Sequence, residues 1–279
     1  MSDRRDGGDS AASGGSFEPR DEIALVNHAW WGHMVESGFQ YTRPWLDLDT
    51  DILRDYIAGY VEVLPRRWIY FYPREALQDL AGKRVLCLAS GGGQQTAALS
   101  LLGARVTVFD LCEAQLAGDR RAAEHFGYEV ETIQGDMRDL SRFSDESFDL
   151  VYQAISLVFV PDLREVFREV LRVLKPGGVY RSGHGNPAVM MVEPETWTGE
   201  GYLLRDTYRT GAIDDADARE FRHGLREIFN GLIESGFAIR GVWEDPRHLH
   251  HDTDAAPGSY EHMLNHVLNY FCVLAGKPG

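Results

Sequence analysis

Residues 84–116 contain the pattern that most constrains the fold of this chain. A short apolar run, Val85–Ala89, leads into three consecutive glycines at 91–93, and a helix-like stretch follows. A second β-rich run, Val106–Phe109, then ends in Asp110. Strand, glycine turn, helix, strand and acid form the unit that binds a nucleotide-like ligand beside a helix N-terminus, because glycine lets the backbone approach the ligand. An acid such as Asp110 could accept hydrogen bonds from both ribose hydroxyls.

The spacing of the glycines distinguishes two kinds of ligand. A dinucleotide site uses G-x-G-x-x-G/A, whereas this chain has Gly91-x-Gly93-x-x-Thr96 and lacks the small third residue that packs helix on strand. The pattern therefore disfavours an NAD-dependent enzyme, which stays an alternative. The stretch instead resembles motif I of the class I S-adenosylmethionine-dependent methyltransferases, although Cys87 and Ala89 stand where the best-known form has an acid and a glycine.

Three further stretches follow in the order of that family and extend the resemblance to residues 80–183. Gln134–Met137 looks like the acidic turn at the adenine, Phe148–Tyr152 like the fourth strand, and Leu171–Tyr180 like the helix end, turn and fifth strand. The resemblance implies S-adenosyl-L-methionine as the cofactor and methyl transfer as the activity. It also implies cofactor contacts by a set of residues at the strand ends and in the N-terminal segment: Tyr41, Ala89, Gly91, Gly93, Gln94, Asp110, Leu111, Gln115, Gly135, Asp136, Met137, Gln153 and Ala154.

The alternation of strand and helix patterns predicts an α/β fold with a doubly wound, mostly parallel seven-stranded sheet. The last two strands look like the antiparallel pair that ends the sheet in this family. Strands are expected at 84–89, 105–110, 128–133, 148–153, 178–183, 237–243 and 268–275. Helices are expected at 94–102, 112–126, 162–173 and 218–235.

The remaining segments divide the chain into three parts. Residues 1–18 are rich in Gly, Ser, Asp and Arg and are expected to form a disordered tail. Residues 19–80 are rich in aromatic side chains and have helix-like pieces near 21–35, 50–63 and 73–80. The resemblance implies that this segment is a helical lid over the cofactor cleft. The methyltransferase domain is expected at 81–279, and its long connection at 184–217 predicts a cap insertion over the strand ends. Tyr41 is either a contact of the cofactor carboxylate or a tyrosine at the edge of the core.

Composition narrows the function. Among 279 residues, 28 are Lys or Arg and 43 are Asp or Glu, so the formal net charge is −15. That charge repels phosphate backbones and anionic membranes, and we find no apolar run long enough to span a bilayer. The three cysteines are far apart in sequence, which is typical of reduced cytoplasmic thiols. We therefore expect a cytoplasmic enzyme with a small-molecule substrate and no nucleic-acid or membrane partner, as a monomer or a homodimer.

Histidines are the candidate catalytic residues. Methyl transfer from a sulfonium is an in-line displacement, so the protein mainly positions the acceptor and excludes water, and needs a base only for a neutral hydroxyl or an acidic carbon. His184 ends the fifth strand at the cleft, and His262 follows in a second insertion at 244–262; each is a candidate general base. The other histidines of that insertion, His248, His250 and His251, resemble metal ligands by type only, so no metal is expected.

The sequence does not identify the methyl acceptor. The expected reaction is methylation of a small organic metabolite at an O, N or C atom. One alternative is a methyltransferase that acts on a macromolecule, protein or RNA. A second alternative is a protein that binds S-adenosylmethionine and uses the fold for a reaction other than methylation.

Overall fold

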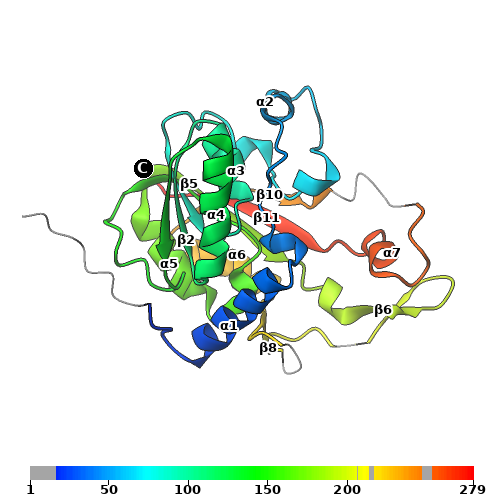
Figure 1. The fold of residues 1–279 in the computed structure, drawn as a ribbon. Coiled ribbons are helices and arrows are strands. Elements are labelled where there is room, and N and C mark those ends of the chain that lie inside the picture. Colours follow the sequence, from blue (N-terminus) through cyan, green and yellow to red (C-terminus); the bar gives the residue numbers. More distant parts are fainter. Residues whose placement is uncertain (1–16, 206, 214–216, 247–252) are drawn as a thin grey trace, which may run out of the picture.

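A seven-stranded sheet forms the centre of the computed structural model, which describes residues 17–205, 207–213, 217–246 and 253–279 (Figure 1). The strand order is β10-β11-β5-β4-β1-β2-β3, and β11 runs antiparallel to both of its neighbours. The strands are β1 (Arg84–Leu88), β2 (Arg105–Asp110), β3 (Val130–Gln134), β4 (Phe148–Gln153), β5 (Leu174–Gly185), β10 (Ala238–Glu244) and β11 (Tyr270–Gly276). The predicted doubly wound, mostly parallel sheet with an antiparallel last strand is confirmed.

Helices cover both faces of the sheet, as Figure 1 shows. On one face, α5 (Leu163–Val173) and α6 (Leu225–Glu234) pack against the sheet through buried apolar side chains. Those of α5 recur every three to four residues, which is the period of a helix with one apolar stripe: Leu163, Val166, Phe167, Val170 and Val173. On the other face, a second core joins the sheet to α2 (Thr50–Ala58), α3 (Gln95–Leu101) and α4 (Glu113–Phe126).

The N-terminal segment is less helical than predicted. α1 (Glu22–Glu36) begins after Asp21, whose side chain accepts the N–H of Ala24. The helix expected over 50–63 ends already at Ala58, because Gly59 adopts a left-handed φ of 84° and caps it. The helix expected over 73–80 is wrong, since only one 3-10 turn, Arg74–Ala76, forms there. Further 3-10 turns are Gln40–Thr42, Arg66–Trp68, Leu157–Phe159 and Val189–Met191.

The helix expected over 218–235 begins seven residues late, at Leu225. Residues Phe221–Arg222 form a short strand, β9, which pairs with β8 (Gly211–Ala212). The Glu227 carboxylate then accepts the N–H of Gly224 and thereby marks the first turn of α6. The apolar periodicity continued into the strand and concealed this boundary.

The long connection at 184–217 contains secondary structure of its own. It includes the antiparallel pair β6 (Val192–Trp197) and β7 (Tyr202–Leu204), and β6 contacts α7 (Tyr260–Leu264) from the second insertion. Figure 1 shows β6 and α7 together at one end of the molecule. The predicted tail at 1–18 lies outside the described residues except for its last two positions. Among the described helices, none combines the length and apolarity that crossing a membrane requires.

Candidate functional site

A cavity lies at the carboxyl ends of β1, β2 and β4, which is where open α/β sheets bind ligands. The N-terminal segment covers it with aromatic side chains, Trp31, Tyr41, Tyr70 and Tyr72 among them. Ten of the predicted cofactor-binding residues line this cavity: Tyr41, Ala89, Gly91, Gln94, Asp110, Leu111, Gln115, Asp136, Met137 and Ala154. Gly93, Gly135 and Gln153 do not line it, and each has a supporting position instead.

Two carboxylates hold the amide groups of the glycine turn. The N–H of Gly91 donates to Oδ2 of Asp110 at 2.9 Å. The N–H groups of Gly92 and Gly93 donate to the two carboxylate oxygens of Asp119, at 2.9 and 3.0 Å. Asp119 lies in the middle of α4 and is fully buried. All three amides are thus bonded within the protein, unlike the free amides of a phosphate-binding loop.

Close packing explains why glycine occupies the turn. A Cβ at Gly91 would lie 2.7 Å from the Cβ of Gln115, and a Cβ at Gly93 would lie 2.4 Å from the carbonyl oxygen of Gly118. Gly93 also has a left-handed φ of 73°. Gly135 is similar, because a Cβ there would lie 2.1 Å from the Phe109 ring. The glycines therefore serve the packing of the turn as much as the approach of a ligand.

Ala89 connects β1 to the glycine turn in a strained conformation. Its φ of 45° is in the left-handed region, which a residue with a Cβ seldom adopts. Its N–H donates to the carbonyl of Phe109, which holds the bend against β2. This is the position where the resemblance led us to expect glycine, and the backbone has the geometry that glycine prefers.

Burial dominates the electrostatics beneath the turn. It raises the pKa of Asp110, although the N–H groups of Cys112 and Gly91 donate to this carboxylate and act in the opposite direction. Burial likewise raises the pKa of Asp119 to about 7 against the same kind of amide donors. The side-chain carbonyl oxygen of Gln115 is also buried without a hydrogen-bond partner, and this residue lines the cavity. Polar groups are therefore available to a ligand at this end.

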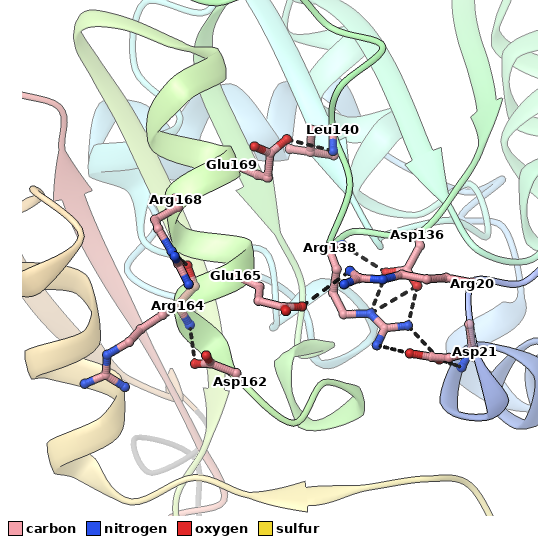
Figure 2. Close-up of polar contacts among 11 residues, drawn as sticks. Arg20, Asp21, Asp136, Arg138, Leu140, Asp162, Arg164, Glu165, Arg168 and Glu169 are labelled. Atoms are coloured by element: carbon pink, nitrogen blue, oxygen red, sulfur yellow. Dashed lines mark hydrogen bonds and ion pairs between the residues drawn. The ribbon is translucent and has the colours of Figure 1, made fainter.

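Arg138 ties the acidic turn after β3 to the first helix, as Figure 2 shows. Its guanidinium donates to both oxygens of Asp136 and, at 2.8 and 3.0 Å, to both oxygens of Asp21, the N-cap of α1. The side chain of Arg138 is only 4% exposed. The hydrogen bond from Arg138 lowers the pKa of Asp21 to about 2. One buried cation thus fixes the start of α1 beside the acidic turn, at the predicted adenine end of the cavity.

Gln153 organises the end of β4 from behind the cavity. It is fully buried, and its Nε2 donates to Ser156 Oγ at 3.0 Å and contacts Met137 Sδ at 3.2 Å. Its Oε1 accepts a hydrogen bond from the hydroxyl of Tyr180. Its backbone carbonyl accepts a hydrogen bond from Arg181. The side chain therefore positions Met137 and Ser156, both of which line the cavity.

Gln94 and Tyr41 connect the N-terminal segment to the glycine turn. The Nε2 of Gln94 donates to the carbonyls of Gln40 and Arg43 at 3.2 and 3.0 Å. The hydroxyl of Tyr41 lies 3.1 Å from that of Tyr70. Gln94 thus holds the segment in place as well as lining the cavity.

Neither candidate base lines the cavity. His184 is 3% exposed, lies 2.8 Å from Ser182 Oγ through Nε2 and stacks on Phe271. Burial lowers the pKa of His184 to about 3, so its imidazole is neutral at physiological pH. His262 on α7 lies 2.6 Å through Nδ1 from the hydroxyl of Tyr202 on β7. A general-base role for either histidine stays a prediction that no contact with the cavity supports.

Two further sequence predictions concern the cap insertion and the metal ligands. Among the described residues, none of 184–217 lines the cavity, so a substrate-capping role of that segment stays a prediction. His248, His250 and His251 lie outside the described residues. Within the part of the chain that the structure describes, no group of three His, Cys, Asp or Glu side chains could hold a metal ion.

Sequence reasoning missed three residues that build the site: Asp119, Arg138 and Arg181. The signal for Asp119 was available, because Gly118 interrupts a helical pattern and so indicates a close backbone approach. Arg138 and Arg181 follow recognised motifs by one residue each, but their partners are distant in sequence.

Comparisons with known proteins agree with this geometry. Residues 86–181 match the family described as "Methyltransferase domain". A protein named "Uncharacterized methyltransferase YbaJ" from Bacillus subtilis (strain 168) is 35% identical over 239 residues, which are 80% of this chain and 91% of that protein. A ubiquinone biosynthesis O-methyltransferase from Pseudomonas syringae pv. tomato is 41% identical over 162 residues, 57% of this chain and 60% of that one.

A solved structure shows the same fold. It is an S-adenosylmethionine-dependent methyltransferase from Mesorhizobium loti, superposed with a TM-score of 0.60 at 26% identity over 73% of this chain and 95% of that one.

Proposed function

Because this chain belongs to the class I S-adenosylmethionine-dependent methyltransferases, we propose that its cavity holds S-adenosylmethionine beside a small organic acceptor. The acceptor is the part of this statement that goes beyond the family. The residues of the cavity suggest how the cofactor and acceptor share the space.

The donor groups in the cavity fit the parts of the cofactor. Asp110, whose oxygens face the turn at the end of β2, would hold the ribose hydroxyls. Asp136 and Met137 would meet the adenine by hydrogen bonding and by contact of the thioether with the ring. The unpartnered oxygen of Gln115 is a further acceptor beside the glycine turn. When bound, the cofactor supplies an activated methyl group on a sulfonium.

The observation that carries a small acceptor is the continuation of the cavity past β4. Beyond Ala154 the lining includes Ser156, Arg181 on β5 and Tyr270 on β11, together with the aromatic rings of the N-terminal segment. A concave, mostly apolar space with few polar groups is typical of small-molecule sites. The net charge of −15 also disfavours a nucleic-acid acceptor.

The residues that line the cavity would act by positioning the acceptor. Trp31 and Phe159 pack edge to face, with ring centroids 5.6 Å apart, and both line the cavity. Such rings hold an apolar acceptor in place and exclude water from the methyl-transfer path. Among the described lining residues there is no histidine, so the proposal assigns no histidine as a general base.

A methyl-label experiment tests the proposal. The full chain would be titrated with S-adenosylhomocysteine by calorimetry and then incubated with methyl-labelled S-adenosylmethionine and a metabolite extract. We expect binding and transfer of label to small molecules that pass an ultrafiltration membrane. Asp110→Ala should weaken binding and slow the transfer of label, whereas Asp139→Ala, which changes an acid outside the cavity lining, should leave both unchanged.

Two outcomes would contradict the proposal and separate the alternatives. Label retained in a protein or RNA fraction would indicate a macromolecular acceptor. Tight binding of S-adenosylhomocysteine without any transfer of label would indicate a reaction other than methylation.

A further inference from the structure

Arg181 is a buried cation in the wall of the cavity. It lies on β5, lines the cavity and is 2% exposed. Its Nε donates to the carbonyl of Tyr72 and one terminal nitrogen donates to the carbonyl of Gln153, both at 2.9 Å. The guanidinium also lies over the rings of Tyr72 and Tyr152, at 5.1 and 4.7 Å from the ring centroids. These partners are dipoles and π faces, so none of them neutralises the charge.

The described residues provide no carboxylate for this guanidinium. None of the described Asp or Glu side chains forms a hydrogen bond or ion pair with Arg181. The charge of Glu75 acts on the Cys272 thiol and that of Asp245 on the Tyr72 phenol, but neither acid bonds to Arg181. The acidic side chains in contact with it are protonated, because burial raises the pKa of Cys272 to about 11 and those of Tyr72 and Tyr152 well above their usual value. An isolated buried charge is costly unless an anion pairs with it.

Tyr72 supplies a second, independent feature at the same place. Its hydroxyl is buried without a hydrogen-bond partner, and the residue is 3% exposed and lines the cavity. A buried hydroxyl without a partner is unfavourable in a protein interior, and a ligand oxygen beside it would remove that cost. The unpaired charge and the unpaired hydroxyl belong to side chains in direct contact.

The position of Arg181 assigns these groups to the acceptor side. In the strand order β5-β4-β1-β2, Arg181 and Asp110 are three strands apart, which is about 14 Å across a sheet. The other basic residue among the described lining residues, Arg138, is already bonded to Asp21 and Asp136. One unpaired guanidinium suits one negative charge. Diphosphates would need more positive charge than this wall provides.

We propose that Arg181 and Tyr72 bind the carboxylate of the acceptor, and that the acceptor is an aromatic organic acid. The remaining N–H groups of the guanidinium would donate to the carboxylate oxygens, and the Tyr72 hydroxyl would donate to one of them. The rings of Tyr70 and Trp31 would contact the apolar part of the acid. This inference rests on the proposed function, since it names the substrate class for the same cavity.

Matched pairs of acids and amides test the assignment. The full chain, saturated with S-adenosylhomocysteine, would be titrated calorimetrically with benzoate and benzamide, with cinnamate and cinnamamide, and with 4-hydroxybenzoate and its amide. We expect at least one acid to bind about tenfold or more tightly than its amide, the lower range for charge-assisted hydrogen bonds. Equal binding of every acid and its amide by the unmodified chain would overturn the assignment, and this result needs no variant.

Variants then locate the effect. Arg181→Met keeps the volume and removes the charge, and should erase the preference for the acid. Tyr72→Phe should reduce the preference, whereas Tyr128→Phe should not, although its hydroxyl is equally buried and unpartnered, because Tyr128 does not line the cavity. A preference that survives in folded Arg181→Met would refute a role for the guanidinium. If that variant does not fold, Arg181→Lys, which keeps the charge without the fork, should show a weakened preference.

The carboxylate of the cofactor is the other possible source of the anion, and a second titration separates the two. Arg181→Met should bind S-adenosylhomocysteine and 5′-methylthioadenosine, which lacks the amino-acid part, as the unmodified chain does. A tenfold loss for S-adenosylhomocysteine alone would assign Arg181 to the cofactor and overturn the acceptor assignment. Failure of the unmodified chain to bind S-adenosylhomocysteine would instead count against the proposed function itself.

Discussion

The Asp119→Asn substitution tests how the glycine turn is held. The buried carboxylate accepts the N–H groups of Gly92 and Gly93. Two effects oppose each other there: burial disfavours the ionised form, and the amide donors favour it. Burial is the larger effect and raises the pKa of Asp119 from 3.8 to about 7. The turn therefore contains an acid whose ionisation destabilises the fold.

The sign of the pH dependence follows from this shift. An acid with a higher pKa in the folded chain binds more protons when folded. Its stabilising contribution is complete below the unfolded value of 3.8 and is lost as the pH rises through about 7. At roughly 1.36 kcal/mol per pH unit, this loss amounts to about 4 kcal/mol for a fully buried group. The asparagine variant does not titrate, so its stability relative to the unmodified chain should increase by up to that amount between pH 4 and pH 8.

Urea unfolding followed by tryptophan fluorescence measures the difference. Both proteins would be unfolded at several pH values from 4 to 8, and contributions from other titrating groups cancel in the comparison. A difference independent of pH, or one that moves toward the unmodified chain as the pH rises, would refute the reasoning and show that the amide donors dominate. Asp119→Ala is a companion variant, in which the N–H of Gly92 keeps its bond to the Gln115 carbonyl at 3.0 Å. The N–H of Gly93 loses its acceptor, which should lower the free energy of unfolding by about 1–3 kcal/mol.

Three further predictions concern single residues. Ala89→Gly should raise the free energy of unfolding by about 1 kcal/mol, because glycine adopts the left-handed φ of 45° without strain; a destabilised variant in urea titration would argue against strain there. Asp110→Ala should weaken S-adenosylhomocysteine binding by about 1.5–3 kcal/mol, and calorimetry showing unchanged affinity in the folded variant would remove Asp110 from the site. Asp21→Asn should lower the free energy of unfolding by about 1 kcal/mol at pH values above 4, a modest amount because this carboxyl is partly exposed. The loss should shrink as the pH falls toward 2, where Asp21 loses its charge, and a loss that persists at pH 2 would contradict the Arg138 pairing.

The sheet was predictable because local residues mark where its strands end. Two of the parallel strands at the cavity, β1 and β2, combine an apolar run with a glycine turn or an acid at the end, as in Val106–Asp110. Such local signals do not depend on distant partners. The error at the start of α6 falls where distant pairing decides the outcome: Phe221–Arg222 form a strand that pairs with Gly211–Ala212. The apolar period of the following helix runs through that strand without a break.

The candidate site was predictable to the same extent. Glycines and acids at strand ends are recognisable by sequence position, and ten of the thirteen predicted cofactor-binding residues line the cavity. The charged residues that support them were not predictable, because their roles depend on partners far along the chain. Arg138 acts through Asp21, 117 positions away, and Arg181 contacts the carbonyl of Tyr72, 109 positions away. Only folding brings these groups together.

The hydrogen bonds of the glycine turn also bear on why the site suits its cofactor. A phosphate-binding loop leaves its amides free to face an anion. Here the amide of Gly91 is bonded to Asp110, and those of Gly92 and Gly93 are bonded to Asp119. The turn thus offers a ligand the carboxylate of Asp110 and no free donor among its glycines, which would repel the pyrophosphate of a dinucleotide. A cofactor with a sulfonium and an ammonium group meets attraction at the same place. These internal bonds therefore disfavour NAD because they close the turn to phosphate, and Thr96 disfavours it for a separate reason, since it stands where a small residue would pack helix on strand.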